Sequence, residues 1–198
     1  AIDKPTFDVT VAVADGALVG QPIADATIHA AGEPVDSGWH AALALGGSFA
    51  GRPLKGTAEA ILDVASGRFA LPEVDLAIAE NRITGAIEQV DGGLLSGSLS
   101  LDAPNLATLA ALALVEASGS ADAKVRFQPD GGKQAVDVAF NGRNIAAATV
   151  VARKAEGNVR IADALGTPEV DGDVDLEGIS AGSFRIDTAR MSATVDGG

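Results

Sequence analysis

The sequence predicts an all-β protein, built as an antiparallel meander with one apolar face and interrupted by one short helix. Two observations carry this prediction. Runs in which apolar and polar residues alternate, as at Trp39, Ala41, Leu43 and Leu45, recur along nearly the whole chain, and strand side chains alternate between faces with the same period. Gly-rich turn signals separate the runs, so consecutive strands are expected to be antiparallel neighbours.

Turn signals set the expected strand ends. They are Asp15-Gly16, Asp91-Gly92-Gly93, Asp130-Gly131-Gly132 and Asn141-Gly142, and such dipeptides supply the positive φ angles that tight hairpin turns require. Together with the alternation they predict twelve strands. The predicted ranges are 6–14, 23–31, 38–50, 56–65, 68–79, 82–90, 94–102, 121–128, 133–141, 146–155, 170–177 and 182–195.

One segment, residues 104–117, breaks the alternation. It begins with a Pro, which suits the first turn of a helix, and Leu106, Leu109 and Leu112 follow helical spacing. We therefore predict one short helix there. A second segment, Asn158–Leu165, fits either a helical turn or the end of a strand, because a Gly and a Pro follow it closely.

Composition excludes several classes of function. The formal net charge is −13, and the 14 Lys and Arg residues are scattered, whereas nucleic acids and anionic membranes bind clustered positive charge. With no Cys, the chain cannot form disulfides, thiolate nucleophiles or zinc–sulfur sites. The chain begins with Ala rather than Met and shows no signal peptide, so we expect a single elongated unit over residues 1–198, cut from a longer protein.

One segment matches a catalytic motif in its letters. Gly178-Ile-Ser180-Ala-Gly182 fits the G-x-S-x-G nucleophile elbow, but strand-like alternation follows it where a helix is required. Both histidines, His29 and His40, precede the serine, whereas that hydrolase order places the base after it. A turn made of small residues is the better interpretation.

Two further sets of residues could ligate a metal by their chemistry, but their spacing does not match a known metal site. Asp171, Asp173, Asp175 and Glu177 alternate with apolar residues, and Leu176 stands where a calcium loop requires Gly. We interpret them as the solvated face of a strand. His29 and His40 lie on separate predicted strands and match no metal-ligand spacing. The sequence therefore predicts no catalytic residues, no metal and no cofactor, and hence no enzyme.

The apolar face is then the remaining functional candidate. Aromatic residues make up only 4% of the chain, and many inward positions are Ala or Gly, which favours an open trough over a filled sandwich core. A trough of aliphatic side chains suits acyl chains, since each buried CH₂ contributes about 0.8 kcal/mol. The alternation proposes these lining residues: Leu43, Leu45, Phe49, Val74, Leu76, Ile78, Ile83, Ile87, Leu95, Leu99, Leu101, Val125, Phe127, Val136, Val138 and Phe140. An ordinary packed core is the alternative.

From about Gly85 to the C-terminus the chain resembles the TamB family of the AsmA-like superfamily, whereas the first eighty residues match only in strand style. The resemblance rests on Leu95-Ser-Gly-Ser-Leu-Ser-Leu-Asp-Ala-Pro-Asn-Leu106, Ser118-Gly-Ser120, Gln134-Ala-Val-Asp-Val138, Ile161-Ala-Asp-Ala-Leu-Gly-Thr-Pro168, Val170-Asp-Gly172 and Ser180-Ala-Gly182.

The resemblance implies a fold and a cellular setting. It implies a curved β-sheet with an apolar groove, the β-taco, in a periplasmic protein held in the inner membrane by a helix that this chain does not contain. It implies phospholipid transport between the membranes, or assistance to outer-membrane protein assembly, with an outer-membrane barrel, TamA, as partner of a docking domain that cannot be assigned to these residues.

Our hypothesis from the sequence is therefore a non-enzymatic groove that shields lipid tails. The alternative is a structural or adhesive β-solenoid whose apolar face only packs. A secreted β-protein that binds or hydrolyses glycans ranks last, because the chain has one Trp and no Tyr.

Overall fold

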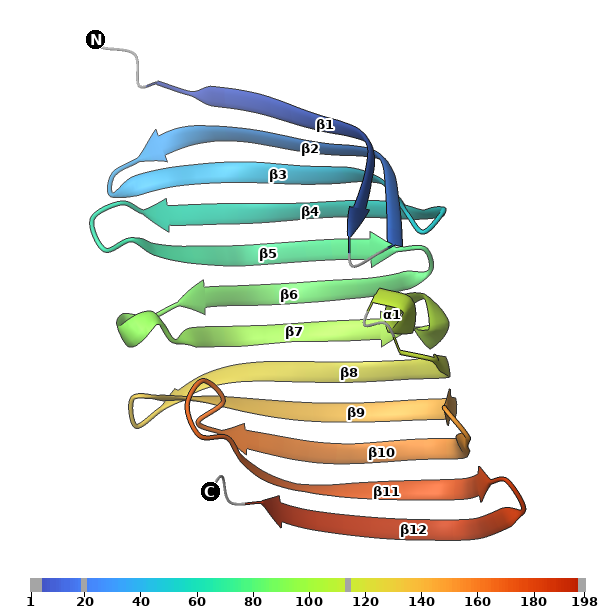
Figure 1. Ribbon diagram of the computed structural model, residues 1–198. Helices are drawn as coiled ribbons and strands as arrows, with labels where there is room; N and C mark the ends of the chain where they lie inside the picture. The colour runs from blue at the N-terminus through green and yellow to red at the C-terminus, as the bar shows by residue number, and fades with distance from the viewer. Residues whose placement is uncertain (1–4, 19–20, 113–114, 196–198) are drawn as a thin grey trace.

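The computed structural model describes residues 5–18, 21–112 and 115–195, which form twelve strands, one α-helix and one short 3-10 turn (Figure 1). The strands are β1 (Phe7–Leu18), β2 (Gln21–Val35), β3 (Gly38–Phe49), β4 (Arg52–Asp63), β5 (Arg68–Ile78), β6 (Asn81–Gln89), β7 (Leu95–Ala103), β8 (Ala117–Asp130), β9 (Lys133–Ala147), β10 (Val150–Ala162), β11 (Glu169–Ala181) and β12 (Phe184–Val195). The helix is α1 (Leu106–Leu112), and the 3-10 turn, η1, spans Asp91–Gly93.

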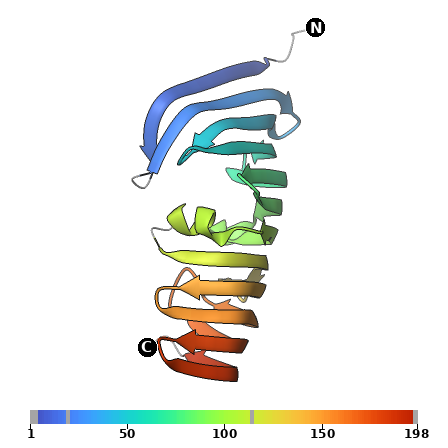
Figure 2. The ribbon, with the colours of Figure 1, turned by 90° about the vertical axis from the view of Figure 1, so that its right-hand side faces the viewer.

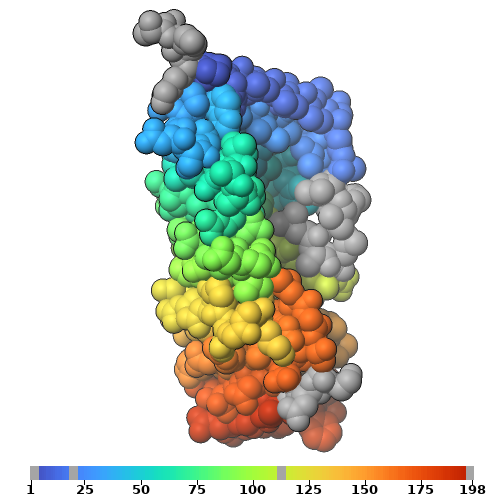
Figure 3. All heavy atoms as spheres, turned by 90° about the vertical axis from the view of Figure 1, so that its left-hand side faces the viewer, coloured from blue at the N-terminus to red at the C-terminus, as the bar shows by residue number. Residues whose placement is uncertain are grey.

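All twelve strands form one open antiparallel sheet in sequence order, from β1 at one end to β12 at the other. The space-filling view follows the same order, with the colours running from blue to red along the molecule (Figure 3). The predicted meander and its twelve strands are therefore confirmed. Each strand pairs only with the strands that precede and follow it in sequence.

Two of the predicted turns are wrong. Asp15 and Gly16 lie inside β1, where they pair with β2, and residues 19–20, between β1 and β2, lie outside the described residues. Asn141 and Gly142 lie inside β9, which continues to Ala147. Neither glycine has a positive φ, because pairing with the neighbouring strands holds both in extended backbone. The turns at Gly92-Gly93 and Gly131-Gly132 are confirmed, each with positive φ.

The predicted helix is confirmed but shorter than expected. It spans Leu106–Leu112 rather than 104–117, residues 113–114 lie outside the described residues, and β8 already begins at Ala117. Asn158–Leu165 ends a strand and then turns. The segment 178–182 reverses direction only at its last residue, since β11 continues to Ala181.

The sheet is curved, and several elements lie over one of its faces. Near the β1–β2 turn the strands curl over the side on which α1 also lies (Figure 2). The bend in β2 coincides with a register shift between Ala24 and Thr27, where Asp25 has a φ of 50°. Gly47 on β3 faces this bend at a φ of 143°, and a Cβ there would lie 2.8 Å from Ala26 Cα. A glycine is therefore required for this close approach of the two strands.

Candidate functional site

The strand register gathers the apolar residues of all twelve strands into rows that cross the sheet. Within a row each residue is the direct cross-strand partner of the next. One row runs Val11, Ile28, Leu45, Gly56, Leu76, Ile83, Leu101, Ala123, Phe140, Gly157, Val174 and Met191. A second runs Val9, Ala30, Leu43, Ala58, Val74, Gly85, Leu99, Val125, Val138, Val159, Gly172 and Ala193. We call this surface the apolar face.

All sixteen residues proposed as groove lining fall on the apolar face. Only Phe49 and Ile78 among them are buried, and the other fourteen are half-buried. The whole chain exposes 11891 Å², whereas compact monomers of 19.7 kDa expose about 8,600 Å² by size scaling. In the described residues no second sheet covers the apolar face, so most of it is surface rather than core.

Helix α1 covers one margin of the apolar face. Several of the least exposed residues of the molecule lie at this margin, including Ala103 at 0% and Phe49 at 2%, whereas Ala135 at 1% and Gln134 at 3% lie at the opposite margin. Two residues of the helix, Thr108 and Ala110, are themselves buried. Since α1 has only seven residues, its place depends on this packing and not on intrinsic helix stability.

Polar contacts hold α1 to strands far from it in sequence. Arg52 Nη1 donates to Thr108 Oγ1 at 2.7 Å. The backbone N–H of Asn105 donates to Asn81 Oδ1 at 3.2 Å, and the amide of Asn81 donates to the Ile78 carbonyl at 3.3 Å. Asn81 is 1% exposed, and these bonds offset the free-energy penalty of burying its amide.

The β10–β11 connection reaches β9 at the opposite margin. The Ala164 N–H donates to the Gln134 carbonyl at 2.8 Å, and Lys133 Nζ lies 2.9 Å from Asp163 Oδ2. The buried Gln134 side chain also bridges to Leu95, accepting from its N–H at 2.7 Å and donating to its carbonyl at 3.1 Å. The hydrogen bond from Lys133 lowers the pKa of Asp163, and the same contact raises the pKa of Lys133.

The backbones of β9, β10 and β11 are irregular near their ends toward residues 144–153 and 178. Past these irregularities the apolar face contains residues that the sequence pattern did not predict. Asn144 has a φ of 50° and Gly178 a φ of 62°, and past these positions Ile145, Ala152, Ile179 and Ile186 form one cross-strand row. The Ile145 side chain fills the space beside Gly142, which places it on the apolar face. A simple period of two misses such residues because each kink shifts the alternation by one position.

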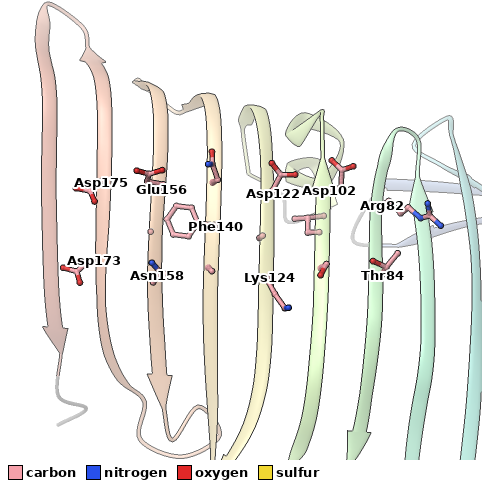
Figure 4. A pocket seen from close by; sticks show the side chains of 16 residues that line it. Arg82, Thr84, Asp102, Asp122, Lys124, Phe140, Glu156, Asn158, Asp173 and Asp175 are labelled. Carbon is pink, nitrogen blue, oxygen red and sulfur yellow. The ribbon is translucent and has the colours of Figure 1, made fainter.

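The opposite face is polar and acidic. It holds a hollow of about 820 Å³ lined mainly by polar side chains from successive strands, among them Asp102, Asp122, Lys124 and Glu156 (Figure 4). Asp102 and Asp122 are direct cross-strand partners. This is the face that the alternation assigned to solvent.

Cross-strand ion pairs link neighbouring strands on this polar face. Asp75 pairs with Arg82 and Asp175 with Arg190. In each pair the guanidinium, by its hydrogen bonds, lowers the pKa of the carboxyl group. These pairs are partly exposed, so each adds little to stability on its own.

The motifs that resembled catalytic or calcium sites are ordinary strand residues. Asp171, Asp173 and Asp175 share the polar face, where they contact Thr194, Ser192 and Arg190 across the β11–β12 pair. Ser180 lies within β11. In the described ranges no group of three or more His, Cys, Asp or Glu residues is placed to hold a metal ion.

The two histidines each pair with one carboxylate. His29 Nε2 lies 2.9 Å from Asp8 Oδ1, and His40 Nε2 lies 2.7 Å from Glu59 Oε2. Both pairs lie on the polar face, and neither faces the apolar rows. Among the described residues, no helix has the length and apolar character needed to cross a membrane.

A scan against protein-family models, a search of curated proteins and a search of solved structures each found no match to this chain. The geometry of the apolar face is therefore the basis for a functional proposal.

Proposed function

We propose that this protein binds the acyl chains of phospholipids on its apolar face and so carries them through water. The observation that carries the proposal is that no second layer covers most of that face among the described residues: twelve strands contribute apolar rows, and fourteen of the sixteen lining residues are only half-buried. Apolar surface of this extent on a protein usually marks a binding site.

The dimensions of the rows suit lipid tails. Twelve strands at about 4.8 Å spacing give a row of roughly 50 Å. One leaflet of tails spans half of the about 30 Å hydrocarbon core of a bilayer. The face therefore offers room for more than one tail along its length, with the chains lying across the strands and parallel to the rows.

The lining chemistry favours alkyl chains over other apolar ligands. The central rows consist mostly of Val, Leu, Ile, Ala and Gly, with Phe140 and Phe127 among the few aromatic residues. Burying ten CH₂ groups contributes about 8 kcal/mol before ordering costs are subtracted. That is enough for retention without any fixed polar contact to a headgroup.

The setting that we propose follows from the TamB-like segments. In it, the chain is part of a periplasmic protein that moves phospholipids between the inner and outer membranes or assists outer-membrane protein assembly, with a TamA-like barrel as partner. The protein acts as a binding surface and not as an enzyme.

The test is a charge placed in the middle of the apolar face. Leu99→Glu is expected to abolish binding of a phospholipid that carries a fluorescent acyl chain, because the carboxylate would be buried against the tail. The thermal midpoint should move little, since Leu99 is only half-buried in the free protein.

Ser98→Glu is the matched control, since Ser98 lies on the opposite face next to Arg126. It should leave both binding and the thermal midpoint unchanged. A collapse of the midpoint in Leu99→Glu would mean that the face is a packed core, as in a structural β-protein. Equal binding by Leu99→Glu and the wild-type chain would refute the lipid proposal.

A further inference from the structure

A group of large apolar side chains lies at the margin opposite α1, where the β2–β3 and β4–β5 hairpins turn, both on the left in Figure 1. Trp39, Leu62 and Phe69 are direct cross-strand partners on β3, β4 and β5 and form the outermost apolar row of this margin. Val35 ends β2 beside this row, and Val64 lies in the β4–β5 turn. We call these five residues the tip cluster.

The tip cluster is exposed although inner strands carry it. Val64 is 63% exposed, Leu62 44% and Phe69 37%. β4 pairs with a strand on each side, so the exposure of Leu62 does not arise from an open edge of the sheet. Large apolar groups that gather at one place on a surface usually mark a site of interaction.

The opposite ends of the same strands are covered. Phe49 ends β3 and Ile78 ends β5 at the margin where α1 lies, and both are buried. The chain thus covers one end of β3 and β5 with its own residues and leaves large apolar groups of similar kind exposed at the other end.

Backbone and side-chain hydrogen bonds hold the two turns of the tip cluster together. The Val64 N–H donates to the Ser37 carbonyl at 3.1 Å, which joins the β4–β5 turn to the β2–β3 turn. Asp63 Oδ1 accepts from the N–H groups of Ala65 and Ser66 at 2.9 and 3.1 Å, so this carboxylate is engaged by its own turn. The apolar side chains of both turns are therefore presented as one unit.

The charge around the tip cluster is acidic. Glu33 and Asp36 are exposed on the β2–β3 hairpin, and Arg68 on β5 pairs with Asp91 at 2.9 Å. The whole chain has a formal net charge of −13. An anionic membrane would repel this surface, whereas a zwitterionic lipid surface presents its ammonium groups outermost and fits it.

The composition of the tip cluster also fits a lipid surface. It contains the single Trp of the chain together with a Phe, a Leu and two Val, and Trp with apolar neighbours is typical of side chains that enter the interface of a bilayer. Along β3 the same face continues from Trp39 through Ala41 to Leu43. The tip cluster is thus continuous with the apolar face.

We propose that the tip cluster docks this protein on the surface of a zwitterionic phospholipid bilayer, with the side chains of Val35, Val64 and Phe69 in the interface. A lipid tail can then pass from the bilayer to the apolar face along β3 without crossing a polar residue. That passage rests on the proposed function, whereas the docking itself does not.

Flotation with phosphatidylcholine–phosphatidylethanolamine vesicles tests the docking. Val64→Asp and Val35→Asp should each lower the partition coefficient onto vesicles at least about tenfold, because the interface would desolvate the new carboxylate. The matched control is Val150→Asp on β10 at the other margin, where the side chain is 45% exposed. It adds the same charge and should bind as the wild-type chain does. All three variants should keep the wild-type thermal midpoint, since each side chain is exposed.

The fluorescence of Trp39 gives a second readout. With vesicles its emission should shift to shorter wavelength, and lipids brominated on the upper part of their tails should quench it. Both changes should be absent in Val64→Asp. Replacing part of the zwitterionic lipid by phosphatidylglycerol should weaken binding, and added salt should reduce this loss.

Three results would overturn the docking proposal. They are a wild-type chain that does not float with zwitterionic vesicles, binding that rises with the share of phosphatidylglycerol, and a Val150→Asp chain that loses as much binding as Val64→Asp.

The variant Leu99→Glu separates docking from acyl-chain binding. It should lose the fluorescent acyl chain and still float with vesicles, because Leu99 lies outside the tip cluster. Loss of flotation in Leu99→Glu would place the bilayer contact on the central rows and overturn docking by the tip cluster. A wild-type chain that floats with vesicles but binds no acyl chain would refute the proposed function alone.

Discussion

The apolar face contains two regions that are alike in sequence and different in environment. At the margin where α1 lies, Phe49, Ile78 and Ala103 are buried. A few residues along the same strands, Leu43 and Leu99 are only half-buried. Both regions belong to the same alternating pattern, so alternation specifies the face of a strand but not whether that face becomes core.

One element that distinguishes the first region is the seven-residue helix α1, with the contacts that hold it. Where α1 lies, a polar group such as Asn81 is fully enclosed and hydrogen-bonded. Away from α1 and from the β10–β11 connection, side chains such as Leu99 stay half-buried. The covered region should therefore govern stability, and the open region should govern ligand binding.

The largest expected difference in stability between the two regions is that between Phe49→Ala and Leu99→Ala. Loss of the buried ring should lower the free energy of unfolding by about 3–5 kcal/mol. Loss of the half-buried leucine should lower it less, by about 1–2 kcal/mol, because part of its surface already meets water. Urea denaturation measures both, and equal losses would contradict the division into two regions.

A smaller effect is expected from the polar contacts under the helix. Asn81→Ala removes the acceptor of the Asn105 N–H and the donor to the Ile78 carbonyl, which should lower the free energy of unfolding by about 1–3 kcal/mol. The control is Asn158→Ala on the exposed polar face, with an expected change of less than about 0.5 kcal/mol. Similar losses in the two variants would show that α1 is not held by Asn81.

The smallest effect concerns the β10–β11 connection and depends on pH. The pKa of Asp163 is lowered from 3.8 and that of Lys133 is raised from 10.5. The folded state thus favours the charged form of each group. The contribution of the pair is present at neutral pH, lost as pH falls through the lowered carboxyl pKa, and lost as pH rises through the raised amine pKa.

Hydrogen exchange of the Ala164 amide measures this effect. At pH 7, Asp163→Asn should exchange faster than the wild-type chain, and the difference should vanish at a pH well below 3.8. Lys133→Gln should reproduce the pH 7 result. A difference that persists in acid would assign the effect to packing instead of charge.

The sequence predicted the strands and the apolar face because both depend on a local period of two. Asp15-Gly16 and Asn141-Gly142 misled the turn prediction, since pairing with neighbouring strands outweighs a local preference for turns. The kinks at Asn144 and Gly178 could not be predicted, because they depend on how adjacent strands coil together. The place of α1 on the face depends on contacts between residues far apart in sequence, such as Arg52 with Thr108.

That last contact has a consequence for how the molecule unfolds. In a single-layer meander each strand touches only its neighbours, so stability is nearly one-dimensional, and the strands can separate from the ends inward, as in repeat proteins. Helix α1 is one exception, since it ties β4 to the segment after β7, and the Gln134 side chain is another, since it links β9 to β7. The slowest-exchanging amides should therefore cluster in β4 to β8, with protection falling toward β1 and β12, and local unfolding should begin at the two edges.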